Sequence, residues 1–176
     1  MSDYRRFRVP GGTYFFTVNL LRRRGNTLLM DGIDALRAAM RDVRAQRPFH
    51  IDGWVVLPEH MHLIMRLPPG DDDFSNRIKS LKIRFSKQMP LSEPRSTVRI
   101  AKGERGIWQR RFWEHTIRDA MDYERHMDYL HFNPVKHGHV TRVSDWPHST
   151  FHGYVKRGLY PADWGGAGVK DFPAGE

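Results

Sequence analysis

The chain has 176 residues, a net charge of +9, 39% hydrophobic residues and no cysteine, which suits one compact domain. The lack of cysteine excludes disulfides, thiolate nucleophiles and cysteine-based zinc sites, and it predicts a reducing compartment, the cytoplasm. No run approaches the roughly 18 apolar residues of a membrane helix, and residues 1–10 lack the apolar core of a signal sequence, so we expect no contact with a membrane.

The first third of the chain is predicted to contain a strand and a helix. Residues 13–20 are rich in β-branched and aromatic side chains, which is typical of a buried strand. From Asp31 to Arg47, apolar residues recur at steps of three and four, and this spacing predicts an amphipathic helix that Pro48 ends.

Two strands with a tight connection are predicted next, at residues 49–57 and 60–67, and their adjacency favours an antiparallel hairpin. Side chains alternate between the two faces of a strand. One face of the second strand is therefore apolar and is expected to face the core: Met61, Leu63, Met65 and Leu67. The other face carries two imidazoles: His60, His62, Ile64 and Arg66.

A second helix is predicted to begin near residues 71–73, because three consecutive aspartates there complement the positive end of a helix dipole. Its apolar stripe has helical spacing: Phe74, Ile78, Leu81 and Phe85. Residues 89–106 contain proline, glycine and serine with little periodicity, so they are predicted to form an exposed loop. Residues 107–112 are predicted to form a strand.

The last regular element predicted is a helix at residues 119–132, which Pro134 ends. The order of elements favours an α+β fold, with a ferredoxin-like antiparallel sheet and helices packed on one face. We assign residues 1–140 to this domain. Residues 141–176 are expected to form an irregular, aromatic-rich C-terminal tail that packs on the same domain.

The excess positive charge is concentrated in one segment. Residues 77–111 contain eleven basic and two acidic residues, which accounts for the whole net charge and predicts a polyanionic partner. Arginine outnumbers lysine by 22 to 7, and because the guanidinium fork matches phosphate oxygens and guanine edges, nucleic acid is favoured over a membrane surface. The alternative is a solvated helix face followed by a loop. A second basic cluster supports the nucleic-acid hypothesis: Arg5, Arg6, Arg8 and Arg22 to Arg24.

His60 and His62 lie on one face of their predicted strand, roughly 6 to 7 Å apart at the backbone, so both could reach one metal ion. Without cysteine, oxygen or nitrogen atoms must complete the ligand set, which favours an octahedral Mg²⁺ or Mn²⁺ over a closed zinc site. An open divalent ion of this kind is suited to polarising a phosphodiester. Two such histidines can equally be satisfied core residues.

Tyr129 and Asn133 are four residues apart and share a helical face. Asn133 could supply its carbonyl oxygen as a third ligand, provided that the helix runs to the residue before Pro134. Taken alone, Tyr129 is consistent with an ordinary aromatic residue at a helix edge. Asn133 is likewise consistent with a helix C-cap.

Four motifs in order carry a resemblance to a known family: residues 10–16 (PGGTYFF), 58–63 (PEHMHL), 107–112 (IWQRRF) and 129–138 (YLHFNPVKHG). Together they resemble the REP-associated tyrosine transposases, which belong to the single-tyrosine HUH transposases of insertion sequences. The similarity runs from about Arg6 to Trp164. Two departures are visible, since relatives often have Gln at the position of Asn133 and Asn at that of Glu59.

The resemblance implies the HUH fold, with His60 and His62 as metal ligands, Asn133 as the third ligand and Tyr129 as the DNA-attacking residue. It implies Mg²⁺ or Mn²⁺ as cofactor and a 5′-phosphotyrosine intermediate that stores the cleaved bond, so that no ATP is needed. The implied substrate is single-stranded DNA with hairpins of repetitive extragenic palindromes (REP). It also implies a monomer, which we expect to be associated with the nucleoid.

Residues expected to bind the DNA come from both basic clusters and the third motif: Arg5, Arg6, Arg8, Arg77, Lys79, Lys82, Arg84, Lys87, Trp108, Arg110 and Arg111. Arginine and lysine would hold phosphates, while Trp108, Phe112 or Tyr14 would stack on bases. Two alternatives remain at this point. The chain could be a non-catalytic protein that binds repeats, or a hydrolytic nuclease that uses a metal-bound water.

Overall fold

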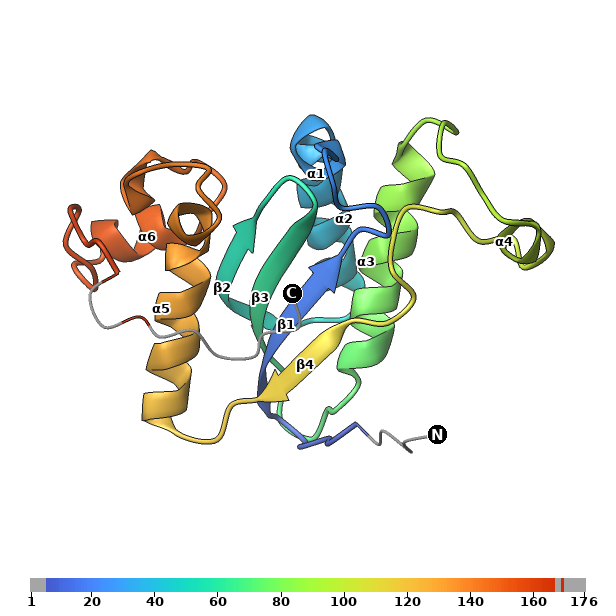
Figure 1. Ribbon diagram of the computed structural model, residues 1–176. Helices are drawn as coiled ribbons and strands as arrows, with labels where there is room; N and C mark the ends of the chain where they lie inside the picture. The colour runs from blue at the N-terminus through green and yellow to red at the C-terminus, as the bar shows by residue number, and fades with distance from the viewer. Residues whose placement is uncertain (1–5, 167–168, 170–176) are drawn as a thin grey trace.

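A four-stranded antiparallel sheet lies at the centre of the chain, in the order β2-β3-β1-β4 (Figure 1). The computed structural model describes residues 6–166 and residue 169. The strands are β1 (Thr13–Asn19), β2 (His50–Val56), β3 (His60–Arg66) and β4 (Trp113–Thr116). Strands β2 and β3 form the predicted antiparallel hairpin, and the α+β fold class is confirmed.

Helices cover both faces of the sheet, not one as the sequence led us to expect. The longer helices are α2 (Ile33–Gln46), α3 (Phe74–Gln88) and α5 (Ala120–Lys136). The shorter ones are α1 (Leu28–Asp31), α4 (Thr97–Ala101), the 3₁₀ helix η1 (Val143–Asp145) and α6 (Phe151–Lys156). Helices α2 and α3 pack on one face, whereas α5 packs on the opposite face (Figure 1). Among the described residues, no helix combines the length and apolar character needed to cross a membrane.

The alternation in β3 explains this two-sided arrangement. Met61, Leu63 and Met65 belong to the large core under α2 and α3, as the sequence predicted. Ile64, on the other face, belongs to a second core with residues of α5. The second face is therefore apolar enough to bury a helix, and this helix carries Tyr129.

Strand β4 begins after the segment predicted to be a strand. Residues 107–109 do not form a strand of their own. They pair with residues 19–21 at the end of β1 through one isolated bridge, between Leu20 and Trp108. Pairing with β1 resumes at Trp113. Between them, Phe112 packs edge-on against Phe16 and Phe74 on the α3 side of the sheet.

Helix α5 continues through Pro134, where the sequence predicted its end. Proline lacks only its own N–H donor, and near the end of a helix this loss affects a single hydrogen bond. The helix ends at Lys136, and Gly138 follows two residues later with a φ of +71°, in the left-handed region that favours glycine. Asn133 therefore has helical geometry, and Lys136 lies on the same helix as Tyr129.

Residues after α5 pack on the outer side of the molecule. Ser149 forms a bridge with Val55, and the Val56 amide donates to the His148 carbonyl, so this segment covers the outer edge of β2. Rings of Phe151 and Tyr160 contact the His131 ring of α5. The sequence predicted aromatic packing here but not the short helices η1 and α6.

Candidate active site

His60 and His62 point from β3 toward α5 and are completely buried, with 0% of each residue exposed. Their ring centroids are 5.0 Å apart. The strand alternation described above places both rings on this face. Because α5 packs over this face, both rings lie close to Tyr129 and Asn133 of that helix.

Each imidazole is oriented by a hydrogen bond to its Nδ1 atom. The His60 Nδ1 atom lies 2.9 Å from a carboxylate oxygen of Glu59, and the His62 Nδ1 atom lies 2.9 Å from the Thr17 hydroxyl oxygen. Metal-binding histidines are commonly held in this way, with the second ring nitrogen left to bind the ion. Nε2 is therefore the nitrogen that each ring would offer to a metal.

Glu59 is well suited to hold His60. Burial disfavours its charged form, but the hydrogen bond and charge of His60 and the hydrogen bond from Arg23 outweigh burial and lower the pKa of Glu59 to about 2. The Arg23 guanidinium donates to the same carboxylate at 3.2 Å. Glu59 is therefore ionised at neutral pH.

Asn133 completes a ligand set on the α5 side. Its Oδ1 atom lies 3.3 Å from the Nε2 atom of His60, and Asn133 is fully buried. Adjacent ligands of an octahedral ion with bonds of about 2.1 Å are about 3 Å apart. Two imidazole nitrogens and one amide oxygen thus fit a divalent ion that keeps positions open for oxygen ligands.

Tyr129 lies beside this ligand set on α5. Its ring packs edge-on against His62, with centroids 5.6 Å apart, and only 1% of the residue is exposed. The hydroxyl accepts a hydrogen bond of 2.8 Å from the Nζ atom of Lys136. The structure therefore brings Tyr129, the two histidines and Asn133 together, as the sequence predicted.

Comparison with known proteins identifies the family of the chain. A family model described as "Transposase IS200 like" matches residues 13–133. A REP-associated tyrosine transposase of Escherichia coli is 54% identical over 176 residues, covering 100% of this chain and 98% of the relative. The chain belongs to the IS200-like transposase family.

Two further relatives support the assignment. A protein of Haemophilus influenzae is 46% identical to this transposase over 171 residues, 94% of each chain. A solved structure of a REP-associated tyrosine transposase bound to a REP hairpin superposes with a TM-score of 0.85 at 54% identity. That match covers 100% of this transposase and 98% of the solved chain.

Two residues that contact the candidate site were not found from the sequence. Thr17 faces His62 only because β1 and β3 pair in the register that sets these two residues opposite one another. Lys136 reaches Tyr129 only because α5 continues past Pro134. The seven-residue spacing of Tyr129 and Lys136, about two helical turns, was a usable signal.

A cationic groove lies between α3 and the segment that carries α4, which projects from the body of the transposase (Figure 1). We define the cationic groove by its basic lining residues: Lys79, Lys82, Lys87, Arg99, Lys102, Arg105 and Arg110. Glu104 is the one acidic residue in the described lining. Lys79, Lys87 and Lys102 form no ion pair with any described residue, so their charges remain available to a polyanion.

Arg77 is not placed to contact DNA, contrary to our expectation, and Trp108 lines the cationic groove with only the small exposed part of its side chain. Arg77 is 3% exposed, and its guanidinium donates to both carboxylate oxygens of Asp71 and to backbone carbonyls, including that of Pro48. Trp108 is 6% exposed and packs edge-on against Phe85 in the core. Both side chains stabilise the fold.

The other basic residues differ in how firmly the protein holds them. Lys82 is buried and donates to the Gln109 carbonyl, and burial together with the nearby Arg6 lowers its pKa to about 8. Arg84 donates to Gln46 on α2. Arg6 contacts the Phe112 ring and pairs with Glu114, and both Arg6 and Arg8 donate to Ser75. Arg8 also pairs with Asp72, and Arg110 pairs with Glu104. Arg111 is exposed, and Arg5 lies outside the described residues.

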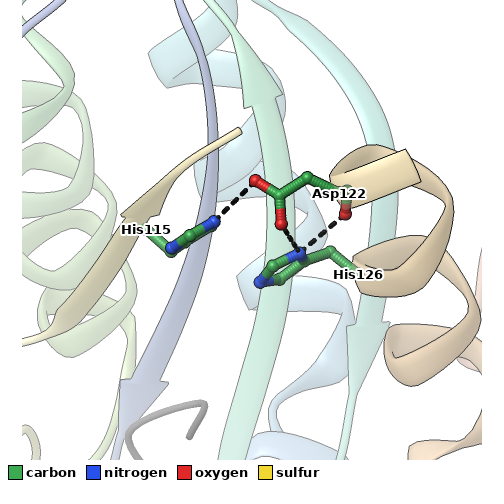
Figure 2. A group of neighbouring side chains, drawn as sticks. All are labelled: His115, Asp122 and His126. Carbon is green, nitrogen blue, oxygen red and sulfur yellow. Dashed lines mark hydrogen bonds and ion pairs between the residues drawn. The ribbon is translucent and has the colours of Figure 1, made fainter. Parts of the chain in front are cut away.

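A cluster of two histidines and one aspartate connects the beginning of α5 to β4. Figure 2 shows the Asp122 carboxylate between the rings of His115, from β4, and His126, one turn along α5. The carboxylate lies 2.8 Å from His115 Nε2 and 3.1 Å from His126 Nδ1. The two rings stack with centroids 4.4 Å apart and planes 14° from parallel, so their nitrogen lone pairs cannot converge on one ion. The cluster is a hydrogen-bond network that fixes α5 to the sheet.

Proposed function

We propose that this transposase cleaves and rejoins single-stranded DNA beside REP hairpins through a covalent bond to Tyr129. The observation that carries the proposal is the packing of the Tyr129 ring against His62, next to the pair formed by His60 and Asn133. The solved relative with 54% identity is bound to a REP hairpin, which supports the same partner here.

The proposed reaction is a transesterification. The Tyr129 oxygen forms a bond with the phosphorus atom while the bond from phosphorus to the 3′ oxygen breaks, so the downstream strand remains attached as a 5′-phosphotyrosine. Attack by a 3′-hydroxyl on this linkage reverses the reaction and can join a different strand. The bond energy is retained throughout, so no ATP is needed.

In this proposal His60, His62 and Asn133 hold Mg²⁺ or Mn²⁺, and such an ion supplies Lewis-acid polarisation of the phosphate. Glu59 and Thr17 keep the two imidazoles turned so that Nε2 faces the substrate side. Burial of the histidines, Asn133 and Tyr129 excludes bulk water, which favours transfer to the phenol over hydrolysis.

The cationic groove is the surface proposed to hold DNA outside the reaction centre. Lys79, Lys87 and Lys102 supply exposed charges for phosphates. Arg110 lines the groove next to Gln109, whose amide donates to the Asn19 carbonyl at the end of β1. Phosphate contacts position nucleic acid without reading its sequence. The groove is therefore expected to orient the hairpin and to leave sequence reading to other contacts.

We further propose that the transposase acts as a monomer in the cytoplasm, where DNA binding associates it with the nucleoid. Coverage of the outer edge of β2 by residues 148–150 supports a monomer, because that edge cannot pair with a second copy. Light scattering of the purified protein at micromolar concentration checks this, and a dimer mass contradicts it.

The test uses a synthetic REP hairpin with single-stranded flanks from the transposase's own genome, labelled at either end. With a 3′ label, the transposase should acquire the label in denaturing gels. With a 5′ label, it should release a free fragment. Tyr129→Phe should abolish both products, while Tyr123→Phe should retain them, because the Tyr123 hydroxyl faces Tyr154 instead of the histidines.

Each alternative has its own outcome. Cleavage by Tyr129→Phe, with no label on the protein, would indicate a hydrolytic nuclease that uses activated water. Binding without cleavage by the unmodified transposase in Mg²⁺ and in Mn²⁺ would indicate a non-catalytic repeat-binding protein.

A further inference from the structure

Lys136 touches the proposed nucleophile directly. Its Nζ atom donates a 2.8 Å hydrogen bond to the Tyr129 hydroxyl and lies 4.7 Å from the centre of the Tyr129 ring. The two residues are seven positions apart on α5, about two helical turns. The contact depends on the passage of α5 through Pro134, because a helix that ended there would leave Lys136 elsewhere.

We propose that Lys136 is a second catalytic residue of strand transfer, an inference that rests on the proposed function of Tyr129. Its ammonium group fixes the direction of the phenolic oxygen and places a positive charge beside the oxygen and phosphate between which the new bond forms. Fixed donors aimed at developing negative charge are often the largest single contribution to catalysis.

The balance of the reaction defines what Lys136 does and does not do. Tyr129 gives up its phenolic proton as the bond from oxygen to phosphorus forms, and the departing 3′ oxygen takes up one proton, so no net proton is consumed. Lys136 donates its hydrogen bond to the phenolic oxygen, and no step takes a proton from it. It therefore acts as a fixed charge and a hydrogen-bond donor, not as the general base.

A lysine has the right chemistry for this position. An ammonium carries three N–H donors and no acceptor, so one group can contact the phenolic oxygen and a phosphate oxygen at the same time. Lys136 is exposed as a residue, although its Nζ atom lies against the buried Tyr129 ring. Its long side chain can therefore follow the oxygen as DNA enters without a change in the helix.

The competing explanation is that Lys136 merely stabilises the end of α5. It is the basic residue in the last turn of this helix, where a positive charge interacts favourably with the helix dipole. Lys156 provides a matched control, because it is the exposed basic residue in the last turn of α6. Its replacement removes the same charge from the same kind of position, away from Tyr129.

The experiment compares Lys136→Met, Lys136→Arg and Lys156→Met with the unmodified transposase on the labelled REP hairpin. Single-turnover rates of cleavage and of rejoining are measured at saturating DNA, together with Kd for the uncleaved hairpin and Tm. Lys136→Met should slow both rates by about 100-fold and leave Kd within about threefold. Lys136→Arg should recover part of the loss, and Lys156→Met should match the unmodified protein.

Three results would overturn the inference. Normal rates in Lys136→Met while Tyr129→Phe is inactive would remove Lys136 from the reaction and leave the proposed function intact. If the rate of Lys136→Met recovers fully at saturating DNA, Lys136 contributes to binding and not to the reaction. If Lys156→Met loses as much rate as Lys136→Met, the effect of Lys136 is on helix stability. By contrast, activity in Tyr129→Phe would refute the proposed function itself.

Discussion

Replacement of Arg77 by Met should unfold the transposase more easily without weakening its hold on DNA. The guanidinium makes five hydrogen bonds: to Asp71 Oδ1 at 3.1 Å and Oδ2 at 2.6 Å, and to the carbonyls of Arg47, Pro48 and Asp73 at 3.2, 2.8 and 2.8 Å. These contacts link the end of α2 and the start of β2 to the first turn of α3. Methionine fills similar space but satisfies none of the acceptors.

The size of the effect follows from burial. Arg77 is 3% exposed, but 32% of the Asp71 side chain is exposed. The carboxylate left behind is therefore partly solvated, and the main cost is that of acceptors left without a donor, about 1 to 3 kcal/mol. The hydrogen bonds of Arg77 also lower the pKa of Asp71. A carboxyl group with a lowered pKa stabilises the fold at pH values above its pKa in the unfolded state, about 3.9. This stabilisation is lost as the pH falls through its pKa in the folded state. The cost of Arg77→Met should therefore shrink at pH 3.

Urea denaturation at pH 7 measures this cost, with Lys79→Met as the control on the exposed face of α3. We expect a loss of about 1 to 3 kcal/mol for Arg77→Met and a change within about 0.5 kcal/mol for Lys79→Met. Hairpin affinity should fall only in Lys79→Met. A stable Arg77→Met variant with weakened hairpin binding would refute the reasoning and return Arg77 to the DNA interface.

Three further predictions concern metal binding, DNA binding and the anchor of α5. Thr17→Val removes the hydroxyl that orients His62 and should weaken Mn²⁺ binding by about 10- to 100-fold; electron paramagnetic resonance of free Mn²⁺ measures this, and unchanged affinity contradicts the role of Thr17. Combined Lys79→Gln and Lys87→Gln should flatten the plot of log Kd against log salt by about 1.4, or 0.7 per lost phosphate contact; an unchanged slope would move the DNA away from the cationic groove. Burial opposes ionisation of Asp122, but hydrogen bonds from His115 and the Arg118 amide lower its pKa, so Asp122→Asn should destabilise the fold by about 1 to 3 kcal/mol at pH 7. Because this stabilisation is lost as pH falls through the lowered pKa, the difference in urea midpoint should narrow by pH 3, and a constant difference would contradict the charge-based explanation.

The sequence was sufficient for the active-site strand because local alternation determines which residues share a face. His60 and His62 face one side of β3 and Met61 faces the other whatever the rest of the fold does. Which helix covers each side is not a local property. Ile64 and Val55 already marked the second face as apolar, yet only the complete topology shows that α5 packs there.

The sequence did contain a signal that two of the basic residues of α3 are buried. Arg77 is three residues after Phe74 and four before Leu81, so it lies on the buried stripe of α3. Lys82 is four residues after Ile78 and three before Phe85, with the same consequence. Charge counting alone treats every cation as exposed, whereas helical spacing separates these two from Lys79 and Lys87.

The most direct test of the account is the identity of the residue that carries DNA. A REP hairpin with single-stranded flanks is incubated with the transposase and Mn²⁺, the reaction is stopped with detergent, and the digested adduct is sequenced by tandem mass spectrometry. The account predicts a 5′-phosphate linked to the Tyr129 oxygen. An adduct on Tyr123 or any other residue, or a cleaved strand with a free 5′-phosphate and no adduct, would contradict it.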